Sequence, residues 1–237
     1  MTAEASARTT GEHHHDHRDV TGGWLRPAVF GVTDGLVSNT SLIAGVAGAH
    51  VGAHNIILTG LAGLAAGAFS MATGEYISVA SQAELTRAEI EIEKAEIKRV
   101  PAAELAELAA IYVGRGVEPD LAKEVARQLS RDPEQAWRVH AREELGVNPD
   151  NLPSAWTAAG SSFVAFGLGA VLPLLPYLLG ATTLVVSVAL AGAGLFSAGA
   201  LVSRFTTRHW FYAGARQLLL GAAAAAVTYG IGSAVGS

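Results

Sequence analysis

The sequence predicts an all-α integral membrane protein with five transmembrane helices and a three-helix cytoplasmic insert between the second and third spans. Half of the 237 residues are hydrophobic and only 16% are charged, a composition too apolar for an ordinary soluble domain. Residues 151–203 and 217–237 contain no Asp, Glu, Lys or Arg. A helix needs about 20 consecutive apolar residues to cross a bilayer, and five segments qualify: 28–49, 55–79, 155–179, 181–203 and 214–235.

These segments divide the chain into four parts. Residues 1–27 form a polar tail, residues 28–80 hold the first two spans, residues 81–150 form an acidic helical domain, and residues 151–237 hold the last three spans. The tail lacks the apolar core of a signal peptide, and we interpret its run HHHDH at 13–17 as a disordered tail in preference to a metal site. The chain has no cysteine, which excludes thiolate metal ligands.

The Lys and Arg residues predict the orientation, because cytoplasmic segments retain positive charge. All sixteen lie in the tail, in the acidic domain or at 204–216, and the short connections at 50–54 and 179–180 have none. With five spans these three regions share one side of the membrane. The tail and the insert are therefore predicted to be cytoplasmic, and the carboxyl terminus to lie on the far side.

The insert is predicted to be helical. Residues 84–150 contain fifteen acidic and ten basic residues and are rich in good helix formers. Proline and glycine positions predict helices at 82–99, 103–113 and 119–145, the last with a break around 130–133. No turn signal precedes residue 82, so the second span is expected to continue unbroken into the first insert helix, as a rod roughly 65 Å long.

Four glutamates in the insert predict a metal site. Glu93 and Glu96 are three residues apart, as are Glu104 and Glu107, and this spacing places side chains on one helix face. If the chain reverses at Pro101, Glu96 lies beside Glu104 and Glu93 beside Glu107. Like charges this close need a cation, and carboxylates suit hard or borderline divalent ions. The alternative is a solvated face, since glutamate is a good helix former.

His140 and Glu144 share a face of the third insert helix and could complete this site. A His–Glu pair at this spacing is also common on helix surfaces. The remaining acids near the site, Glu89, Glu91 and Glu143, are assigned to solvated helix faces.

Two acids, Asp34 and Glu75, lie within the predicted spans. Such groups are costly in a bilayer and usually face a bundle interior or a water-filled path. Counting helical rise from the charged ends of the two spans places Asp34, Met71 and Glu75 at a similar depth. A thioether is a soft ligand that tolerates transition metals, so the three residues predict a cation path. The alternative for Met71 is that it fills a gap in the packing.

Four blocks in this order resemble the vacuolar iron transporter family, which includes the nodulin-21-like proteins: FGVTDGLVSNTSLIAGVAGA, FSMATGEYISVASQ, the Glu-rich segment and HAREELG. The resemblance covers nearly all of the chain after Arg18. It implies a homodimer with five spans per subunit that exports ferrous iron from the cytosol in exchange for protons, along a path at the dimer interface.

The resemblance also implies roles for particular residues. Asp34 and Met71 match the metal-handling positions of the path, and we include Glu75 as a further path residue. The carboxylates of the cytoplasmic metal-binding domain are matched by Glu93, Glu96, Glu104, Glu107 and Glu144. Some members carry methionines on the third cytoplasmic helix, where this chain has Val139, His140 and Ala141.

The sequence thus predicts a non-enzymatic, proton-coupled exporter of divalent iron, with manganese, zinc or cobalt as alternative ions at the same site. The expected partners are a second subunit, divalent metal ions, protons and the lipid bilayer, and no nucleic acid. The expected location is the cell membrane of a prokaryote or the vacuolar membrane of a eukaryote. The alternatives are a membrane-anchored metal sensor and a di-iron oxidase, although Trp137 stands where a Glu-x-x-His motif ending at His140 needs glutamate.

Overall fold

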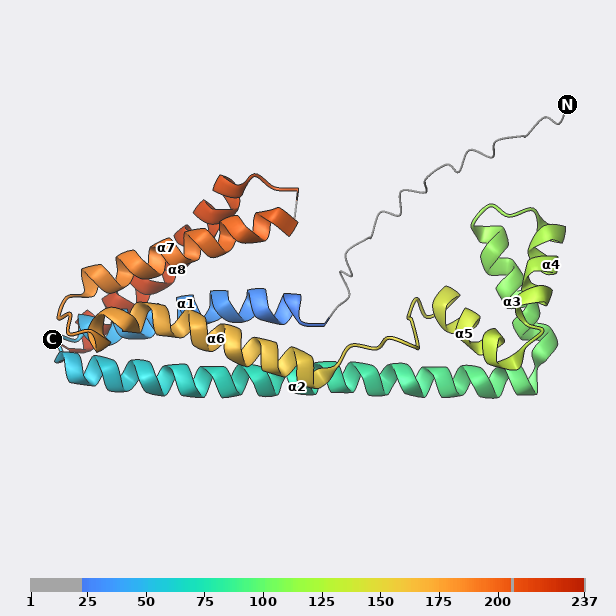
Figure 1. Ribbon diagram of the computed structural model, residues 1–237, viewed down its shortest axis with the longest axis horizontal. Helices are drawn as coiled ribbons and strands as arrows, with labels where there is room; N and C mark the ends of the chain where they lie inside the picture. The colour runs from blue at the N-terminus through green and yellow to red at the C-terminus, as the bar shows by residue number, and fades with distance from the viewer. Residues whose placement is uncertain (1–22, 206, 237) are drawn as a thin grey trace, which may run out of the picture.

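The computed structural model describes residues 23–205 and 207–236 as an all-helical chain (Figure 1). The helices are α1 (Leu25–Gly48), α2 (Ala53–Arg99), α3 (Pro101–Gly114), α4 (Pro119–Leu129), α5 (Pro133–Glu143), α6 (Ala155–Leu178), α7 (Leu184–Val202) and α8 (Trp210–Val235), with a 3₁₀ turn η1 (Ser203–Phe205). The His-rich run at 13–17 lies outside the described residues.

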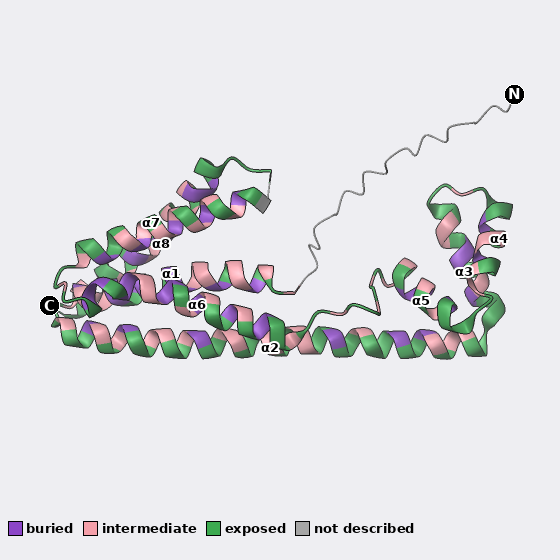
Figure 2. Ribbon diagram, viewed as in Figure 1, coloured by how far each residue is buried: buried purple, intermediate pink, exposed green. Residues whose placement is uncertain are grey.

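Five helices, α1, α2, α6, α7 and α8, are long and apolar enough to cross a membrane, as the sequence predicts. Many of their large apolar side chains point outward: Phe69 is 66% exposed, Leu219 68% and Val185 76%. Figure 2 shows exposed positions recurring along α2 and α7, whereas α1 is mostly intermediate or buried. A surface this apolar is stable in lipid and not in water, which identifies an integral membrane protein.

Helix α2 runs without a break through 47 residues, which corresponds to about 70 Å. Its first part is apolar and packs against α1 and α6, whereas its charged part after residue 83 extends beyond them (Figure 1). The expected continuous rod is therefore confirmed. It joins the insert to the membrane helices without a flexible linker.

Helices α1 and α6 form the most extensive contact in the bundle, and glycines make it possible. A Cβ atom on Gly35 would overlap the carbonyl oxygen of Phe166, and one on Gly169 would overlap that of Val32. Small residues let the backbones of membrane helices approach this closely. The crossing holds the middle of α1, where Asp34 lies, firmly against α6.

The ends of the five helices fall into two groups. At one end Ser161 of α6 donates a hydrogen bond to the carbonyl oxygen of Trp24, just before α1, at 2.8 Å. At the other end Ile43, Ile56 and Tyr177 pack in one cluster near the α1–α2 and α6–α7 turns. The insert and the α7–α8 connection lie toward the first end, and the carboxyl terminus lies at the second (Figure 1). The described segments that carry Lys and Arg thus share one end of the bundle. The side of the membrane that this end faces stays a prediction.

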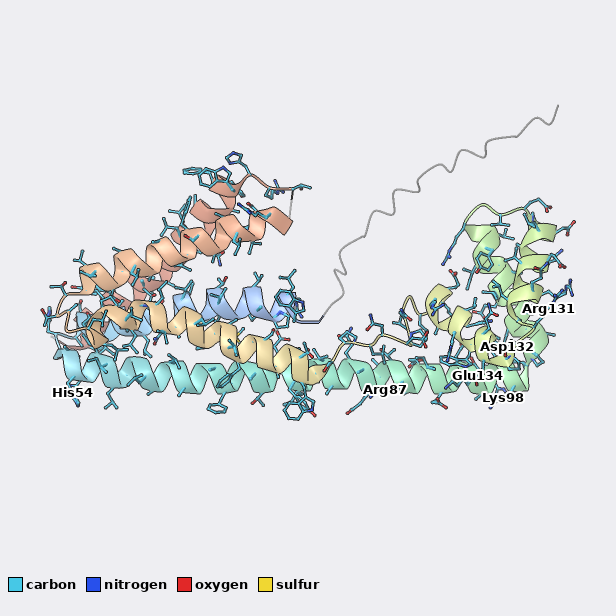
Figure 3. The ribbon with its side chains drawn as sticks, viewed as in Figure 1. His54, Arg87, Lys98, Arg131, Asp132 and Glu134 are labelled. Atoms are coloured by element: carbon cyan, nitrogen blue, oxygen red, sulfur yellow. The ribbon has the colours of Figure 1, made fainter. Side chains whose placement is uncertain are left out.

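The insert consists of α3, α4 and α5 together with the charged part of α2. The third helix expected from the sequence is two helices, α4 and α5, separated at residues 130–132, where a break was expected. All three insert helices begin at a proline, whose fixed backbone suits the first helical turn. Figure 3 shows Arg131, Asp132, Glu134 and Lys98 in the insert and His54 at the opposite end of α2.

The reversal of the chain at Pro101 differs from the expected antiparallel pairing. Only Val100 separates α2 from α3, and antiparallel helices need a connection of about two to five residues. Helix α3 therefore rises away from α2 and packs against α4, while α5 lies beside α2 (Figure 1). This arrangement changes which glutamates meet.

Candidate metal sites

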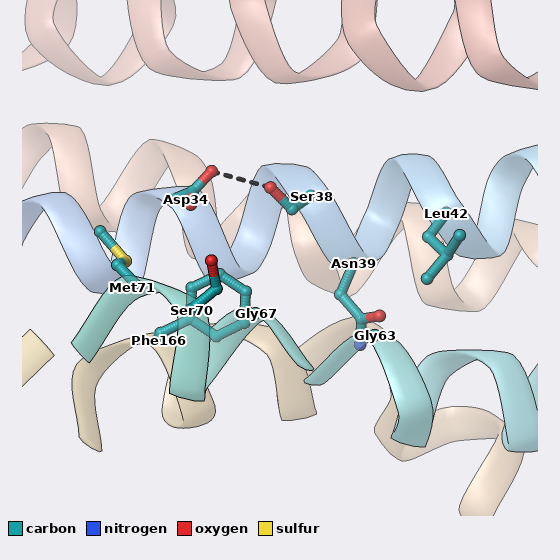
Figure 4. Close-up of a pocket in the computed structure, with 9 residues that line it drawn as sticks. All are labelled: Asp34, Ser38, Asn39, Leu42, Gly63, Gly67, Ser70, Met71 and Phe166. Carbon is teal, nitrogen blue, oxygen red and sulfur yellow. Dashed lines mark hydrogen bonds between the residues drawn. The ribbon is translucent and has the colours of Figure 1, made fainter. Parts of the chain in front are cut away.

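A pocket of about 240 Å³ lies between α1 and α2, with Phe166 of α6 at its base (Figure 4). Its lining combines a carboxylate, a thioether, an amide and two hydroxyls with apolar residues: Asp34, Ser38, Asn39, Leu42, Gly63, Gly67, Ser70, Met71 and Phe166. It is the place where polar side chains of the first two spans meet.

Asp34 and Met71 line this pocket together from neighbouring helices. Asp34 is partly exposed, and its Oδ1 accepts a hydrogen bond from the hydroxyl of Ser38, one turn later, at 2.7 Å. Met71 packs against a small buried cluster that includes Phe166 and Ala68. Met71 therefore fills packing space and also borders the pocket, so the two interpretations of this residue are compatible.

Glu75 lies one turn beyond Met71 on α2 and is partly exposed. It is not among the described residues that line the pocket. The structure thus brings together two of the three expected path residues, and Glu75 is placed beside the pocket on the side of the insert.

Three polar residues of the pocket were not selected from the sequence: Ser38, Asn39 and Ser70. Uncharged polar residues are common in membrane helices, where they bond to neighbouring backbone, so their type alone carries little signal. Their positions do carry some, since Ser38 is one turn from Asp34 and Ser70 is adjacent to Met71. Asn39 is the most buried of the three, at 2% exposure.

The second site lies in the insert, where α2, α3 and α5 converge. Glu93, Glu104 and His140 are all buried, and one ligand atom from each lies within 4.8 Å of the others. His140 Nδ1 is 2.9 Å from Glu93 Oε1, 3.9 Å from Glu104 Oε2 and 3.8 Å from Glu144 Oε2. His140, whose part in the site the sequence leaves open, therefore lies at the centre of the cluster.

Two atoms of this cluster lack hydrogen-bond partners among the described residues. Glu93 Oε1 and His140 Nδ1 face each other, but neither makes a hydrogen bond of acceptable geometry. Buried polar atoms in proteins are almost always satisfied, so an unpartnered pair requires an explanation. A divalent cation between convergent oxygen and nitrogen atoms would satisfy both.

Two carboxyl groups of the cluster, those of Glu93 and Glu144, have raised pKa values. Burial, followed by the negative charges of Glu144, Glu104 and Glu96, raises the pKa of Glu93 to about 7. Burial and then the charge of Glu107 raise the pKa of Glu144. The charges of the other three expected glutamates thus act on Glu93 or Glu144. Glu93 and Glu104 are buried inside the cluster, and Glu107 is exposed at its rim.

The pairing within the cluster differs from the expected register. Glu93 meets Glu104, and the negative charge of Glu107 acts on Glu144. The reason is the direction of α3, which points away from α2 from its first residue onward. The first turn of α3, which carries Glu104, therefore lies close to Glu93.

The acids assigned to solvated faces stay outside the cluster. Glu89 and Glu91 are exposed, and Glu91 pairs with Lys94 at 2.8 Å. Glu143 points to the other side of α5, where it pairs with Arg115 and accepts a hydrogen bond from the hydroxyl of Tyr112 at 3.2 Å. Glu143 therefore ties α5 to α3.

The two sites offer complementary ligands. The insert presents several carboxylate oxygens and one imidazole nitrogen, a set that suits borderline ions such as ferrous iron, cobalt and zinc and also accepts manganese. The pocket presents a carboxylate and a thioether, together with neutral oxygens.

Comparison with known proteins decides the family. The model of the VIT family matches residues 25–233, a range that contains both sites, the first four apolar helices and all but the last two residues of α8. The chain belongs to the VIT family. The resemblance found in the sequence is thereby confirmed.

Individual VIT-family relatives match over most of their length. Vacuolar iron transporter 1 of Oryza sativa subsp. japonica is 34% identical over 234 residues, covering 97% of this chain and 92% of the relative. A vacuolar iron transporter of Acanthamoeba castellanii is 37% identical, covering 90% of this chain and 78% of the relative. Vacuolar iron transporter 1 of Eucalyptus grandis is 34% identical, covering 99% of this chain and 95% of the relative.

Proposed function

We propose that this chain transports divalent iron across a membrane. The observation that carries the proposal is the pocket between α1 and α2, in which Asp34 and Met71 meet inside an apolar bundle. An acid within a membrane helix is costly and marks an ion pathway, and a carboxylate with a thioether suits a transition-metal ion. The names of the relatives, vacuolar iron transporters, support iron as the cargo.

The acidic insert would collect metal from the cytosol and raise its concentration near the pocket. The convergence of Glu93, Glu104 and His140, with Glu96, Glu107 and Glu144 around them, supports this role. The shared end of the Lys- and Arg-bearing segments supports a cytoplasmic position for the insert. Transport would then run from the cytosol to the far side.

The carboxylate ligands support a coupling of metal transport to protons. Protons and metal ions compete for the same carboxylates, so protons that enter from the far side would release metal from Asp34. Manganese, cobalt and zinc are further candidate ions, because the ligand set does not reject them on chemical grounds.

We also propose that two copies enclose the path. The pocket opens at the surface of the single chain, where Ser38 is exposed and Leu42 is 37% exposed. A second copy over this face would separate the ion from lipid. Light scattering of the detergent-solubilised protein should give twice the chain mass of 24.4 kDa, and a monomer would contradict this part of the proposal.

Flux in proteoliposomes tests the function. Ferrous iron uptake is measured anaerobically with a pH gradient, for the native chain, for Asp34→Asn, and for Asp120→Asn, whose carboxylate is an exposed partner of Lys123 in the insert. We expect loss of flux in Asp34→Asn only, and slower flux without the gradient. Metal binding without flux would favour a membrane-anchored sensor. In a separate aerobic assay, oxygen consumption in proportion to added iron would favour an oxidase.

A further inference from the structure

Asn39 occupies an unusual position in the pocket. It lies five residues after Asp34 on α1, which places it about 7.5 Å farther along the helix axis. Its side chain is 2% exposed, and its Nδ2 donates a hydrogen bond to the carbonyl oxygen of Ala170 on α6 at 2.6 Å. Its Oδ1 is buried and has no hydrogen-bond partner in the part of the chain that the structure describes.

The contact with Ala170 fixes which way the amide faces. A backbone carbonyl can only accept a hydrogen bond, so the nitrogen of Asn39 must face it. Rotating the amide would bring two oxygens together at that distance and leave the nitrogen without its acceptor. The Oδ1 atom is therefore held on the side of α2, toward Gly63 (Figure 4).

The missing side chain of Gly63 leaves space beside this buried oxygen. A Cβ atom on Gly63 would lie 3.2 Å from Asn39 Oδ1 and would overlap the side chain of Leu42. Without that atom, Oδ1 borders the pocket at the end where Leu42 lies, while Met71 lies at the other end (Figure 4). The pocket thus has a charged entry at Asp34 and Met71 and a neutral oxygen farther along α1.

Resting on the transport function proposed above, we propose that Asn39 Oδ1 is a second binding position for the metal ion, reached after Asp34 and Met71. An amide oxygen is a hard, neutral ligand that binds divalent ions without the strong attraction of a carboxylate. Transport requires positions that bind strongly enough for entry and weakly enough for exit. Asn39 provides the weaker position, deeper along α1 than the acid.

A position that follows the first binding event affects turnover more than apparent affinity. Asn39→Leu, which keeps the size of the side chain and removes the oxygen, is therefore expected to lower the maximal rate of ferrous iron or manganese uptake about tenfold, with the KM changed less than about twofold. Asp34→Asn, which removes the negative charge that attracts the ion to the first position, should instead abolish saturable uptake.

Asn39→Leu also removes the hydrogen bond to Ala170, so a second variant is needed. Gly63→Ala leaves Asn39 and that bond intact and places a methyl group against Oδ1. The matched control is Thr40→Val. Thr40 is also buried on α1, its hydroxyl donates a hydrogen bond to the carbonyl oxygen of Leu36 in its own helix, and it does not line the pocket. All rates are normalised to the amount of folded protein in the liposomes.

We expect a lower maximal rate in both Asn39→Leu and Gly63→Ala and a native rate in Thr40→Val. A loss in Asn39→Leu alone would assign the residue to α1–α6 packing and overturn the proposal, as would native rates in both variants. If the native chain carries no iron or manganese, the proposed transport function fails and this inference fails with it. That outcome differs from a native chain that transports metal while both variants keep its rate, which would overturn only the role of Asn39.

Discussion

Metal binding by the insert should weaken steeply as the pH falls below neutrality. Burial, and then the charges of Glu144, Glu104 and Glu96, raises the pKa of Glu93 to about 7. A metal ion binds the deprotonated carboxylate and must displace this proton. One unit below the pKa only about a tenth of the sites are deprotonated, so the apparent affinity should be about tenfold weaker near pH 6 than near pH 8.

The same shift affects the stability of the metal-free protein. The pKa of Glu93 rises from 4.5 to about 7 on folding, so the folded state holds a proton that the unfolded state releases between these values. The resulting stabilisation is fully present below pH 4.5 and is lost as the pH rises through 7, a change of about 3 kcal/mol. Bound metal should reverse this loss above pH 7.

Calorimetric titration of the full chain in detergent with manganese or cobalt tests this reasoning. Asp34→Asn serves as the background, so that the membrane pocket contributes less. Glu93→Gln should weaken binding at least about tenfold and flatten its pH dependence near neutrality. The matched control is Glu91→Gln, two residues away on α2, exposed and paired with Lys94. The assignment of Glu93 as a metal ligand with a raised pKa would be refuted if the metal affinity of the intact cluster did not change with pH. It would also be refuted if Glu91→Gln lowered the affinity as much as Glu93→Gln.

Three further outcomes are expected. His140→Ala should weaken binding of cobalt and zinc more than binding of manganese, because imidazole nitrogen suits the first two better; equal losses in parallel titrations would contradict this. Gly35→Val should reduce the yield and thermal stability of the folded protein in detergent, because its side chain would overlap the Phe166 carbonyl; an unchanged melting curve would argue against the close α1–α6 crossing. Arg115→Met should lower insert stability by up to about 1 kcal/mol, as expected for a half-exposed ion pair, with metal affinity unchanged in the same titrations.

The helices of the membrane bundle were largely predictable from the sequence. Their signal is composition over about 20 residues, which needs no knowledge of neighbours, and the uninterrupted α2 followed from the lack of any turn residue. The break near residue 131 was also visible, because Pro133 suits a helix start. The direction of α3 was not predictable, since the angle at a one-residue connection depends on what α3 packs against.

The candidate sites, like the fold, were predictable from the sequence only in part. The sequence by itself determined the ligand types: acids in the spans stand out because they are costly there, and glutamates at three-residue spacing share a helix face. Tertiary structure alone decided which of them meet. It paired Glu93 with Glu104, placed His140 between them, left Glu75 beside the pocket and turned Asn39 toward it. The physical reason is that spacing fixes a side chain's direction about its own helix axis, whereas contact depends on how separate helices cross.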